Sequence, residues 1–492
     1  MIELIKRAKL HGNQIAVKYS SQSYSYNQLL TVSENLAQVI LASKTDINEA
    51  RVAMMVNPGF DYIAVQWAIW RAGGVAVPLC LTYPQPSLKY TIEDSESSIV
   101  IVSEAYAPLL NAMCEEKKIR LLVVGKEIPE SIKNLPDISS ERNAMILYTS
   151  GTTNKPKGVV ITHQNLEAQI TSLINAWEWK STDHTLCVLP LHHVHGIVNV
   201  ICCAMWAGAT CEFIDGFSAD EIFALFEKGE LNLFMAVPTI YFKLIAYWET
   251  ISEAEQNTFT DSMKNFRLMV CGSAALPVTI MEKWKQISGH ILLERYGMTE
   301  MGMAISNPYL GERRPGYVGI PLPGVKVQLV NEKFETVQPG VPGEILVKGE
   351  NVFHQYWNNP VATKESFTMD GWFKTGDVAI EEDGYYRIMG RNSVDIIKSG
   401  GYKISALEIE EVLRTHNEIS DCAVVGITDE EWGELIVAAL VTRETNFDTT
   451  TLHEWLRERM ASYKTPRKYL LLKELPRNAM GKVTKNDVKK LF

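Results

Sequence analysis

One loop of this chain combines hydroxyl groups, glycine and lysine in a pattern suited to binding phosphate. It covers residues 148–159 and reads YTSGTTNKPKGV. Small residues let backbone N–H groups approach a ligand, hydroxyl groups donate hydrogen bonds, and lysine ammonium groups neutralise phosphate charge. The GxxxxGK[ST] pattern of P-loop nucleotidases is not met, because Pro156 stands at the second glycine and Gly158 follows the lysine. Most loops of such composition are solvated surface segments, so two interpretations stay open: a surface loop, or a phosphate-binding loop of another kind.

A cluster of three histidines lies at residues 191–196, which read LHHVHG. Imidazole nitrogens bind metals, and Cys202 and Cys203 follow nearby, but the spacing matches no tetrahedral zinc pattern. Histidines that line a core or a cleft are the more common outcome of such a sequence. We therefore expect core or cleft histidines here and no zinc site.

Around these segments, short apolar runs alternate with amphipathic helical patterns. Strands are expected at residues 51–56, 75–78 and 98–102, and helices at 26–43, 61–72 and 86–94. Further strands are expected at 209–214, 231–237, 267–271 and 291–295. A βαβ order with right-handed crossovers predicts parallel sheets covered by helices.

The texture of the chain changes at about residue 318. Short alternating runs up to residue 388, separated by Gly, Pro and Asn turns, predict a compact antiparallel unit, taken here as a small β-barrel. Beyond Gly390 the pattern becomes βαβ-like again, with helices at 408–416 and 451–460 and strands at 421–427 and 435–442. We predict an α/β protein in which residues 1–390 form doubly wound sheets plus the barrel unit. Residues 391–492 then form a small, mobile α+β domain.

The composition of the 492-residue chain is that of a globular enzyme. Hydrophobic residues make up 46% and charged residues 22%, which excludes a disordered, collagen-like or purely coiled-coil protein. Acidic residues exceed basic ones by 58 − 48 = 10, which argues against a protein that coats nucleic acid or anionic membrane. The start of the chain has no apolar core of a signal peptide, and the eight cysteines follow no disulfide framework. We predict a cytoplasmic protein without membrane insertion.

The phosphate-type loop is the first of an ordered series of motifs. The others are Gly272-Ser273-Ala274-Ala275, YGMTE at 296–300, GWFKTGD at 371–377, Gly390-Arg391, KSGGY at 398–402 and Gly481-Lys482. Together they resemble the signatures of the adenylate-forming superfamily, which includes acyl-CoA synthetases, nonribosomal adenylation domains and luciferases. The resemblance covers essentially the whole chain. Asn154 stands where the family usually has glycine, but Asn tolerates positive φ, so the turn can persist.

The resemblance implies ATP and Mg²⁺ as cofactors and gives roles to individual residues. Tyr296 would stack on adenine, Thr299 would bond phosphate, and Glu300 would supply a hard carboxylate oxygen to Mg²⁺. Asp377 would bond the ribose hydroxyls, and Arg391 would support the same end of the nucleotide. The other residues implied to contact the nucleotide are Thr149, Ser150, Gly151, Thr152, Thr153, Lys157, Gly272, Ser273, Ala274, Gly297, Gly400, Gly401 and Lys482.

The family carries out two half-reactions, and Lys482 is implied to serve the first. Its ammonium would stabilise charge on the α-phosphate while the acyl-adenylate forms. The small domain would then rotate so that the thiol of coenzyme A, the co-substrate, displaces AMP. We place the hinge within residues 393–395. One residue more than the commonest family spacing lies between Arg391 and Gly400, so the hinge residue itself stays open.

The substrate is suggested by residues 306–319, SNPYLGERRPGYVG, together with HVHG and GMTEMGMA. These segments resemble the malonyl-CoA synthetase branch, in which an arginine matching Arg314 pairs with the distal carboxylate of the diacid. A guanidinium fork suits a carboxylate. His193 and Ser273 would join Arg314 in the acyl pocket, and His193 is also assigned to catalysis with Thr299, Glu300 and Lys482. Malonate or methylmalonate is therefore the predicted substrate.

Three alternatives remain beside a malonyl-CoA ligase. The first is a ligase for short- or medium-chain monocarboxylates. The second is an adenylation enzyme that loads a carrier protein, although no carrier domain follows Phe492. The third, from another class, is a catalytically silent nucleotide-binding regulator, which intact Glu300, Asp377 and Lys482 argue against. The oligomeric state is open, and no nucleic-acid partner is expected.

Overall fold

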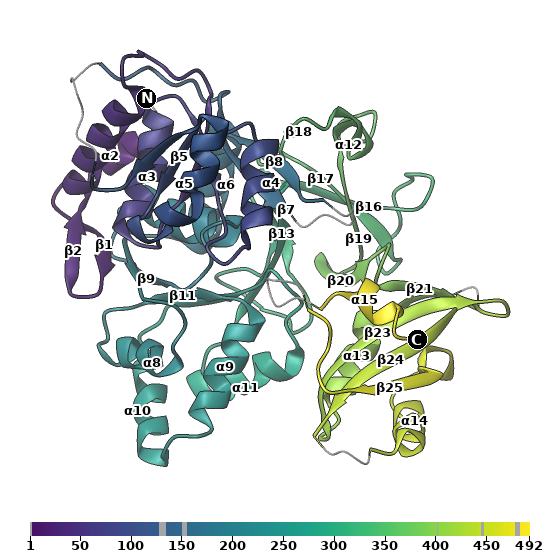
Figure 1. The fold of residues 1–492 in the computed structure, drawn as a ribbon. Coiled ribbons are helices and arrows are strands. Elements are labelled where there is room, and N and C mark those ends of the chain that lie inside the picture. Colours follow the sequence, from purple (N-terminus) through teal and green to yellow (C-terminus); the bar gives the residue numbers. More distant parts are fainter. Residues whose placement is uncertain (1, 127–133, 150–154, 401, 444–446, 478–482) are drawn as a thin grey trace.

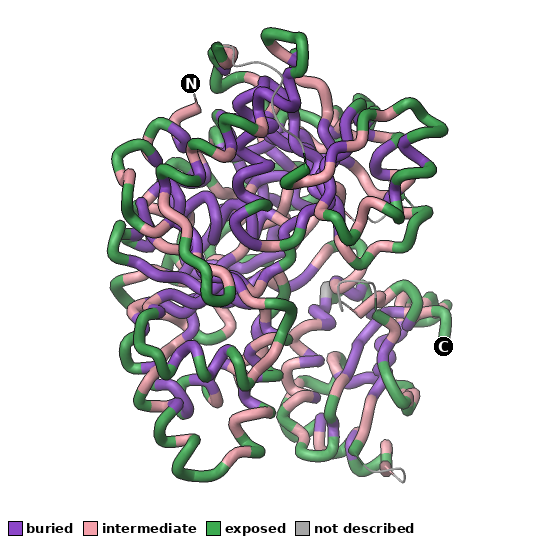
Figure 2. The backbone as a smooth tube through the Cα atoms, turned by 60° about the vertical axis from the view of Figure 1, so that its left-hand side comes forward, coloured by how far each residue is buried: buried purple, intermediate pink, exposed green. Residues whose placement is uncertain are grey.

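The computed structural model describes residues 2–126, 134–149, 155–400, 402–443, 447–477 and 483–492. Two large mixed sheets and their helices form the N-terminal part, followed by a small antiparallel sheet and a separate C-terminal unit (Figure 1). Buried residues concentrate where the two large sheets and their helices meet, with smaller buried centres elsewhere (Figure 2). The fold class is confirmed as α/β with a large N-terminal and a small C-terminal part.

The first large sheet has seven strands in the order β18-β8-β7-β4-β3-β5-β6. These are β3 (Arg51–Met55), β4 (Val75–Pro78), β5 (Ile99–Val102), β6 (Arg120–Val123), β7 (Asn143–Thr149), β8 (Lys157–Thr162) and β18 (Gln355–Tyr356). Its centre is parallel and fully buried, as expected for near-continuous apolar runs. The associated helices are α2 (Tyr26–Leu41), α3 (Phe60–Arg71), α4 (Gln85–Asp94), α5 (Ala107–Lys117) and α6 (His163–Trp177). The strands and helices expected between residues 26 and 102 are all present.

The second large sheet has nine strands in the order β15-β14-β13-β12-β11-β9-β10-β1-β2. These are β1 (Ile15–Tyr19), β2 (Gln22–Ser25), β9 (His184–Cys187), β10 (Thr210–Phe213), β11 (Leu233–Ala236), β12 (Leu268–Cys271), β13 (Leu293–Met298), β14 (Gly302–Ser306) and β15 (Ile320–Pro321). Helix α3 is buried on every side except at Asp61, as its nearly continuous apolar sequence dictates. A second core packs around α8 (Ala219–Glu227), α9 (Pro238–Trp248), α10 (Glu253–Met263) and α11 (Val278–Ser288).

The unit taken as a β-barrel is an open sheet. Its antiparallel order is β16 (Lys326–Val330), β17 (Gly343–Lys348), β19 (Phe373–Glu382) and β20 (Tyr385–Arg391). In the part of the chain that the structure describes, edge strands β16 and β20 do not pair with each other, so the barrel does not close. Four short strands suffice for a two-faced sheet, whereas closure needs more strands at a steep tilt.

The C-terminal unit has its own sheet and its own apolar clusters. Its elements are β21 (Ile396–Ser399), β22 (Tyr402–Ser405), α13 (Ala406–Arg414), β23 (Ile419–Asp429), β24 (Gly433–Thr442), α14 (Thr449–Arg457), β25 (Lys468–Leu472) and α15 (Lys485–Lys489). β23 and β24 form an antiparallel hairpin, and β25 returns parallel to β24 after α14. Buried clusters lie on both faces of this sheet. Among the described residues, no helix is both long and apolar enough to cross a bilayer.

Candidate active site

The carboxyl ends of four parallel strands bring three of the sequence motifs together. β9, β11, β12 and β13 are parallel neighbours in the nine-stranded sheet. The histidine segment follows β9, Gly272 and Ser273 follow β12, and Thr299 and Glu300 follow β13. Because such strands end at the same edge of a sheet, ligands of α/β proteins bind there. The site therefore lies where the fold alone would place it.

Gly272 and Arg295 form the base of this edge. A Cβ atom on Gly272 would stand 2.7 Å from the Arg295 guanidinium, so any larger residue here would force the guanidinium to shift. The guanidinium donates a hydrogen bond to Ser273 Oγ over 3.2 Å. Ser273 Oγ in turn lies 3.2 Å from His195 Nδ1. The Arg295 guanidinium, the Ser273 hydroxyl and the His195 imidazole are thus in contact with one another in series next to Gly272.

The Arg295 guanidinium is buried without a carboxylate partner. The residue is 3% exposed, and no described carboxylate lies within 4.0 Å of its nitrogens. Its Nε makes no hydrogen bond within the described chain. Burial lowers the pKa of Arg295 to about 10, so the group stays a cation at neutral pH. A buried cation of this kind calls for an anion from outside the protein.

His195 stays neutral beside this cation. Burial, the Arg295 charge and His193 together hold the pKa of His195 well below its usual range. Its Nε2 is buried and has no hydrogen-bond partner in the described part of the chain. His193 was expected in the pocket, but the contact with Ser273 is made by His195. His193 is half-buried, with its ring 4.0 Å from that of His192.

The other end of the site joins β13 to the small antiparallel sheet. Asp377 on β19 accepts a hydrogen bond from the Tyr296 hydroxyl over 2.6 Å and another from Arg391 Nε over 3.0 Å. Asp377 and Arg391 are register partners on β19 and β20. Arg391 also donates to the Thr375 carbonyl over 3.3 Å. The three residues expected at the adenine and ribose end are therefore in direct contact.

Glu300 is the candidate Mg²⁺ ligand. It is 6% exposed, and its Oε1 accepts a hydrogen bond from the Tyr356 hydroxyl over 2.9 Å. Burial raises the pKa of Glu300, while Arg391 and Lys157 act in the opposite direction. Lys157 Nζ lies 5.1 Å from the centre of the Tyr356 ring. A buried carboxylate oxygen near Arg391 and Lys157 suits a hard divalent ion that also binds phosphate. Tyr356 is a site residue that no sequence motif indicated.

Several expected site residues lie outside the described residues: Ser150, Gly151, Thr152, Thr153, Gly401 and Lys482. The chain enters the phosphate-type loop at Thr149 and leaves it by Lys157, which pair across β7 and β8. A Cβ on Gly297 would meet the Gly302 carbonyl oxygen at 2.1 Å, so this glycine is needed for packing. Ala274 and Gly400 are exposed.

Arg314 lies at the surface with partners of its own. Its Nε is 3.0 Å from Glu312 Oε2, and its Nη1 is 3.6 Å from Asp383 Oδ2. Its guanidinium also stacks 4.1 Å from the centre of the Tyr385 ring. The neighbouring Arg313 donates to backbone carbonyls, the shortest bond being 2.6 Å to Ile291. Both arginines thus have partners within the described chain.

Comparison with known proteins identifies the family of the chain. The family model "AMP-binding enzyme" matches residues 4–357, and "AMP-binding enzyme C-terminal domain" matches residues 408–482. The chain is 43% identical to malonate–CoA ligase ACSF3, mitochondrial, of Bos taurus, over 98% of this chain and 89% of that protein. It is 38% identical to a malonate–CoA ligase of Arabidopsis thaliana, over 97% and 86%. The crystal structure of ATP-bound MatB from Rhodopseudomonas palustris matches with a TM-score of 0.91 and 30% identity, over 100% of this chain and 98% of that chain.

Proposed function

Because the chain belongs to the AMP-binding enzyme family, we propose that it is an AMP-forming acid–CoA ligase for malonate or methylmalonate. The overall reaction joins the diacid, ATP and coenzyme A to give the acyl-CoA, AMP and pyrophosphate. One observation carries the choice of a diacid: the buried guanidinium of Arg295 beside Ser273 and His195.

A diacid and an apolar acid make opposite demands on the pocket. One carboxylate of malonate reacts, so the other enters a closed site without water. Such a charge costs several kcal/mol unless a cation meets it. A pocket for propionate or butyrate would gain nothing from an uncompensated buried cation, which is itself costly. We therefore assign the distal carboxylate to Arg295 rather than to Arg314, whose charge is already balanced at the surface.

The nucleotide is proposed to lie between the acyl pocket and the small antiparallel sheet. Tyr296, Asp377 and Arg391 would hold adenine and ribose, and Lys157 with Thr299 would face the phosphates. Glu300 would hold Mg²⁺, which when bound neutralises phosphate charge and thereby favours attack on phosphorus. The other residues proposed to contact the nucleotide are those of the phosphate-type loop, together with Gly272, Ala274, Gly297, Gly400 and Gly401.

The reaction proceeds in two steps on this arrangement. A carboxylate oxygen of the acid bonds to the α-phosphorus and pyrophosphate leaves, with the Lys482 ammonium proposed to stabilise the developing negative charge. The thiol sulfur of coenzyme A then bonds to the acyl carbon, and AMP leaves. We propose that residues 1–390 and 391–492 are the two domains and that rotation within residues 393–395 separates the steps. The independent apolar clusters of the C-terminal unit support this division.

The test is pyrophosphate exchange into ATP with a panel of malonate, methylmalonate, propionate and butyrate, followed by thioester assay with coenzyme A. Malonate or methylmalonate should exceed the monoacids by at least about 30-fold in kcat/KM, as expected when a buried charge pair forms. If kcat/KM for propionate equalled that for malonate, the choice of a diacid would be wrong and only the assignment as an acid–CoA ligase would remain. Thioester formed on a pantetheinylated carrier protein but not on coenzyme A would identify the carrier-loading alternative.

The cytoplasm is the proposed location, supported by eight buried cysteines without disulfides in the described chain. The name of the bovine relative places that protein in mitochondria. Imaging of the full chain with a C-terminal tag distinguishes the two compartments.

A further inference from the structure

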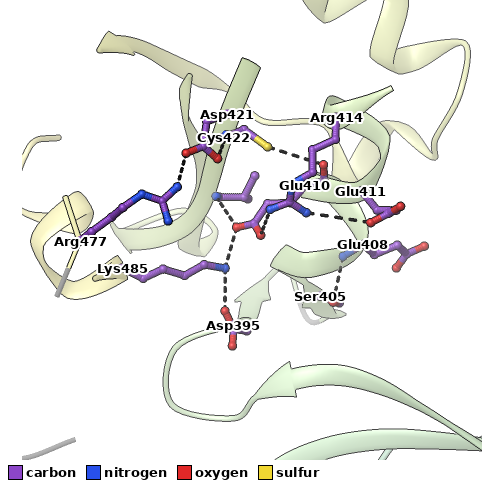
Figure 3. Close-up of polar contacts among 11 residues, drawn as sticks. Asp395, Ser405, Glu408, Glu410, Glu411, Arg414, Asp421, Cys422, Arg477 and Lys485 are labelled. Atoms are coloured by element: carbon purple, nitrogen blue, oxygen red, sulfur yellow. Dashed lines mark hydrogen bonds and ion pairs between the residues drawn. The ribbon is translucent and has the colours of Figure 1, made fainter. Parts of the chain in front are cut away.

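A single lysine near the C-terminus joins two distant segments of the chain. Lys485 Nζ lies 2.6 Å from Asp395 Oδ1 and 2.7 Å from Glu410 Oε1 (Figure 3). The three side chains are 9%, 16% and 3% exposed. Asp395 comes from the segment between β20 and β21, and Glu410 comes from α13. The cluster is thus a buried ion triad rather than a surface pair, whose contribution would be small.

The partners of each carboxylate show what the lysine does. Glu410 also accepts a hydrogen bond from the Val424 N–H over 2.8 Å and pairs with Arg414 over 3.3 Å. Asp395 has no second cation among the described residues; its Oδ2 accepts the Arg391 N–H over 2.9 Å. Loss of Lys485 would therefore leave Asp395 without a cation while Glu410 kept one.

The contact between Lys485 and Asp395 joins two segments to which the proposed function gives roles. Lys485 follows Lys482 by three residues. The intervening Val483 bridges to Arg477, and the Thr484 N–H donates to the Pro476 carbonyl over 2.9 Å. Asp395 belongs to the segment in which the proposed rotation occurs, and its carboxylate reaches back to the backbone of Arg391.

We propose that Lys485 is a positioning residue that couples the conformation of the 393–395 segment to the placement of Lys482. Glu410 and Lys485 belong to the same unit, so their contact persists in every orientation of that unit. Asp395 also lies within residues 391–492, but it ends the 393–395 segment, so rotation at Asp395 itself would alter its contact with Lys485. This inference rests on the proposed function, because it assigns the coupling to the adenylation step.

The test compares Lys485→Met, Lys485→Arg and Lys490→Met. Lys490 is the matched control, because it is a lysine of the same segment whose partner Asp487 is exposed. Lys485→Met should lower kcat for malonate-dependent exchange by about 100-fold with little change in KM, as misplacement of a catalytic group does. Thioester formation from supplied malonyl-adenylate should fall by less than about threefold, since Lys482 is not assigned to that step. Lys485→Arg, which keeps the charge, should regain at least about tenfold of the loss.

A second measurement does not depend on activity. Hydrogen exchange should speed up at two N–H groups in Lys485→Met. The Arg391 N–H donates to the Asp395 carboxylate, and the Asp395 N–H donates to the Arg391 carbonyl in the same turn. Lys490→Met should leave these groups unchanged. If Lys485→Met does not fold, Asp395→Asn weakens the same contact and keeps the Glu410 pair, and the same pattern is expected.

The inference would be overturned if Lys485→Met lost activity equally in both half-reactions, or if its hydrogen-exchange rates around residue 391 did not change. Either result would show that the triad only stabilises the fold. Absence of pyrophosphate exchange with every acid in the wild-type protein would instead overturn the proposed function. The two failures are therefore distinguishable.

Discussion

Replacement of Arg295 by methionine is the most direct test of the acyl pocket. Arg295→Met keeps an unbranched side chain beneath Gly272 but removes the charge that contacts Ser273. The distal carboxylate of malonate would then be buried without a cation. Truncation of one partner of such a pair costs about 2–5 kcal/mol, which corresponds to about 30-fold to 5,000-fold in kcat/KM. Propionate carries no distal charge, so its kcat/KM should stay the same or rise.

The assay is the initial rate of pyrophosphate release at varied acid concentration, with the KM for ATP measured in parallel. That KM should not change, because Tyr296, Asp377 and Arg391 form a separate group at the other end of the site. Arg314→Met is the matched control, since it makes the same chemical change where the cation is already paired. The reasoning is refuted if Arg295→Met lowers kcat/KM for malonate and for propionate by the same factor. It is also refuted if Arg314→Met causes the malonate-selective loss.

The same substitution should have the opposite effect on stability. Without substrate, Arg295 is a buried cation whose Nε has no partner in the described chain. Replacement of buried ionic groups by apolar ones can raise the free energy of unfolding by about 1–4 kcal/mol. We expect substrate-free Arg295→Met to unfold at a higher temperature than the wild type. Malonate should stabilise only the wild type.

Three other perturbations address the remaining parts of the site. Lys482→Ala should abolish acyl-adenylate formation, measured by pyrophosphate exchange. Thioester formation from supplied acyl-adenylate should stay within about threefold of wild type. An equal loss of rate in both half-reactions would contradict this division of roles. Val394→Pro fixes φ and removes an N–H that donates to the Arg391 carbonyl over 3.0 Å, so thioester formation should fall while exchange persists. If the variant keeps both steps, the hinge lies elsewhere. Gly272→Ala places a methyl group 2.7 Å from the Arg295 guanidinium, so malonate-dependent pyrophosphate exchange should drop by at least about tenfold, and by more than propionate-dependent exchange. An unchanged malonate rate would show that the guanidinium can move away.

Much of the fold was predictable because many of its strands are continuous apolar runs and many of its helices show a clear helical period of apolar residues. The apolar runs at β3, β4 and β5 and the helical periods of α2 and α3 appear where the sequence indicates them. The βαβ-like interpretation of residues 421–442 is wrong in one respect, since β23 and β24 are antiparallel. Only three residues separate Asp429 from Gly433, and a parallel pair needs a crossover of about a dozen residues. The connection length was thus sufficient to predict the hairpin.

The buried arginine was harder to find, and the reason is physical. Sequence shows that Arg313 and Arg314 are adjacent, but it does not show that Glu312 and Asp383 already neutralise Arg314. Arg295 looks equally occupied, because Glu294 precedes it. Successive side chains of a strand point to opposite faces, so this glutamate cannot reach the guanidinium beside it.

The structure bears out that geometry. Glu294 accepts the Leu276 N–H over 3.2 Å, and burial raises the pKa of Glu294 to about 8, while Arg295 turns to Ser273. Glu294 and Arg295 are adjacent on β13 but do not form an ion pair, and the raised pKa favours a protonated Glu294 at neutral pH. Each side chain therefore needs its own explanation, and for Arg295 the glycine that follows the neighbouring strand leaves the room that the guanidinium occupies.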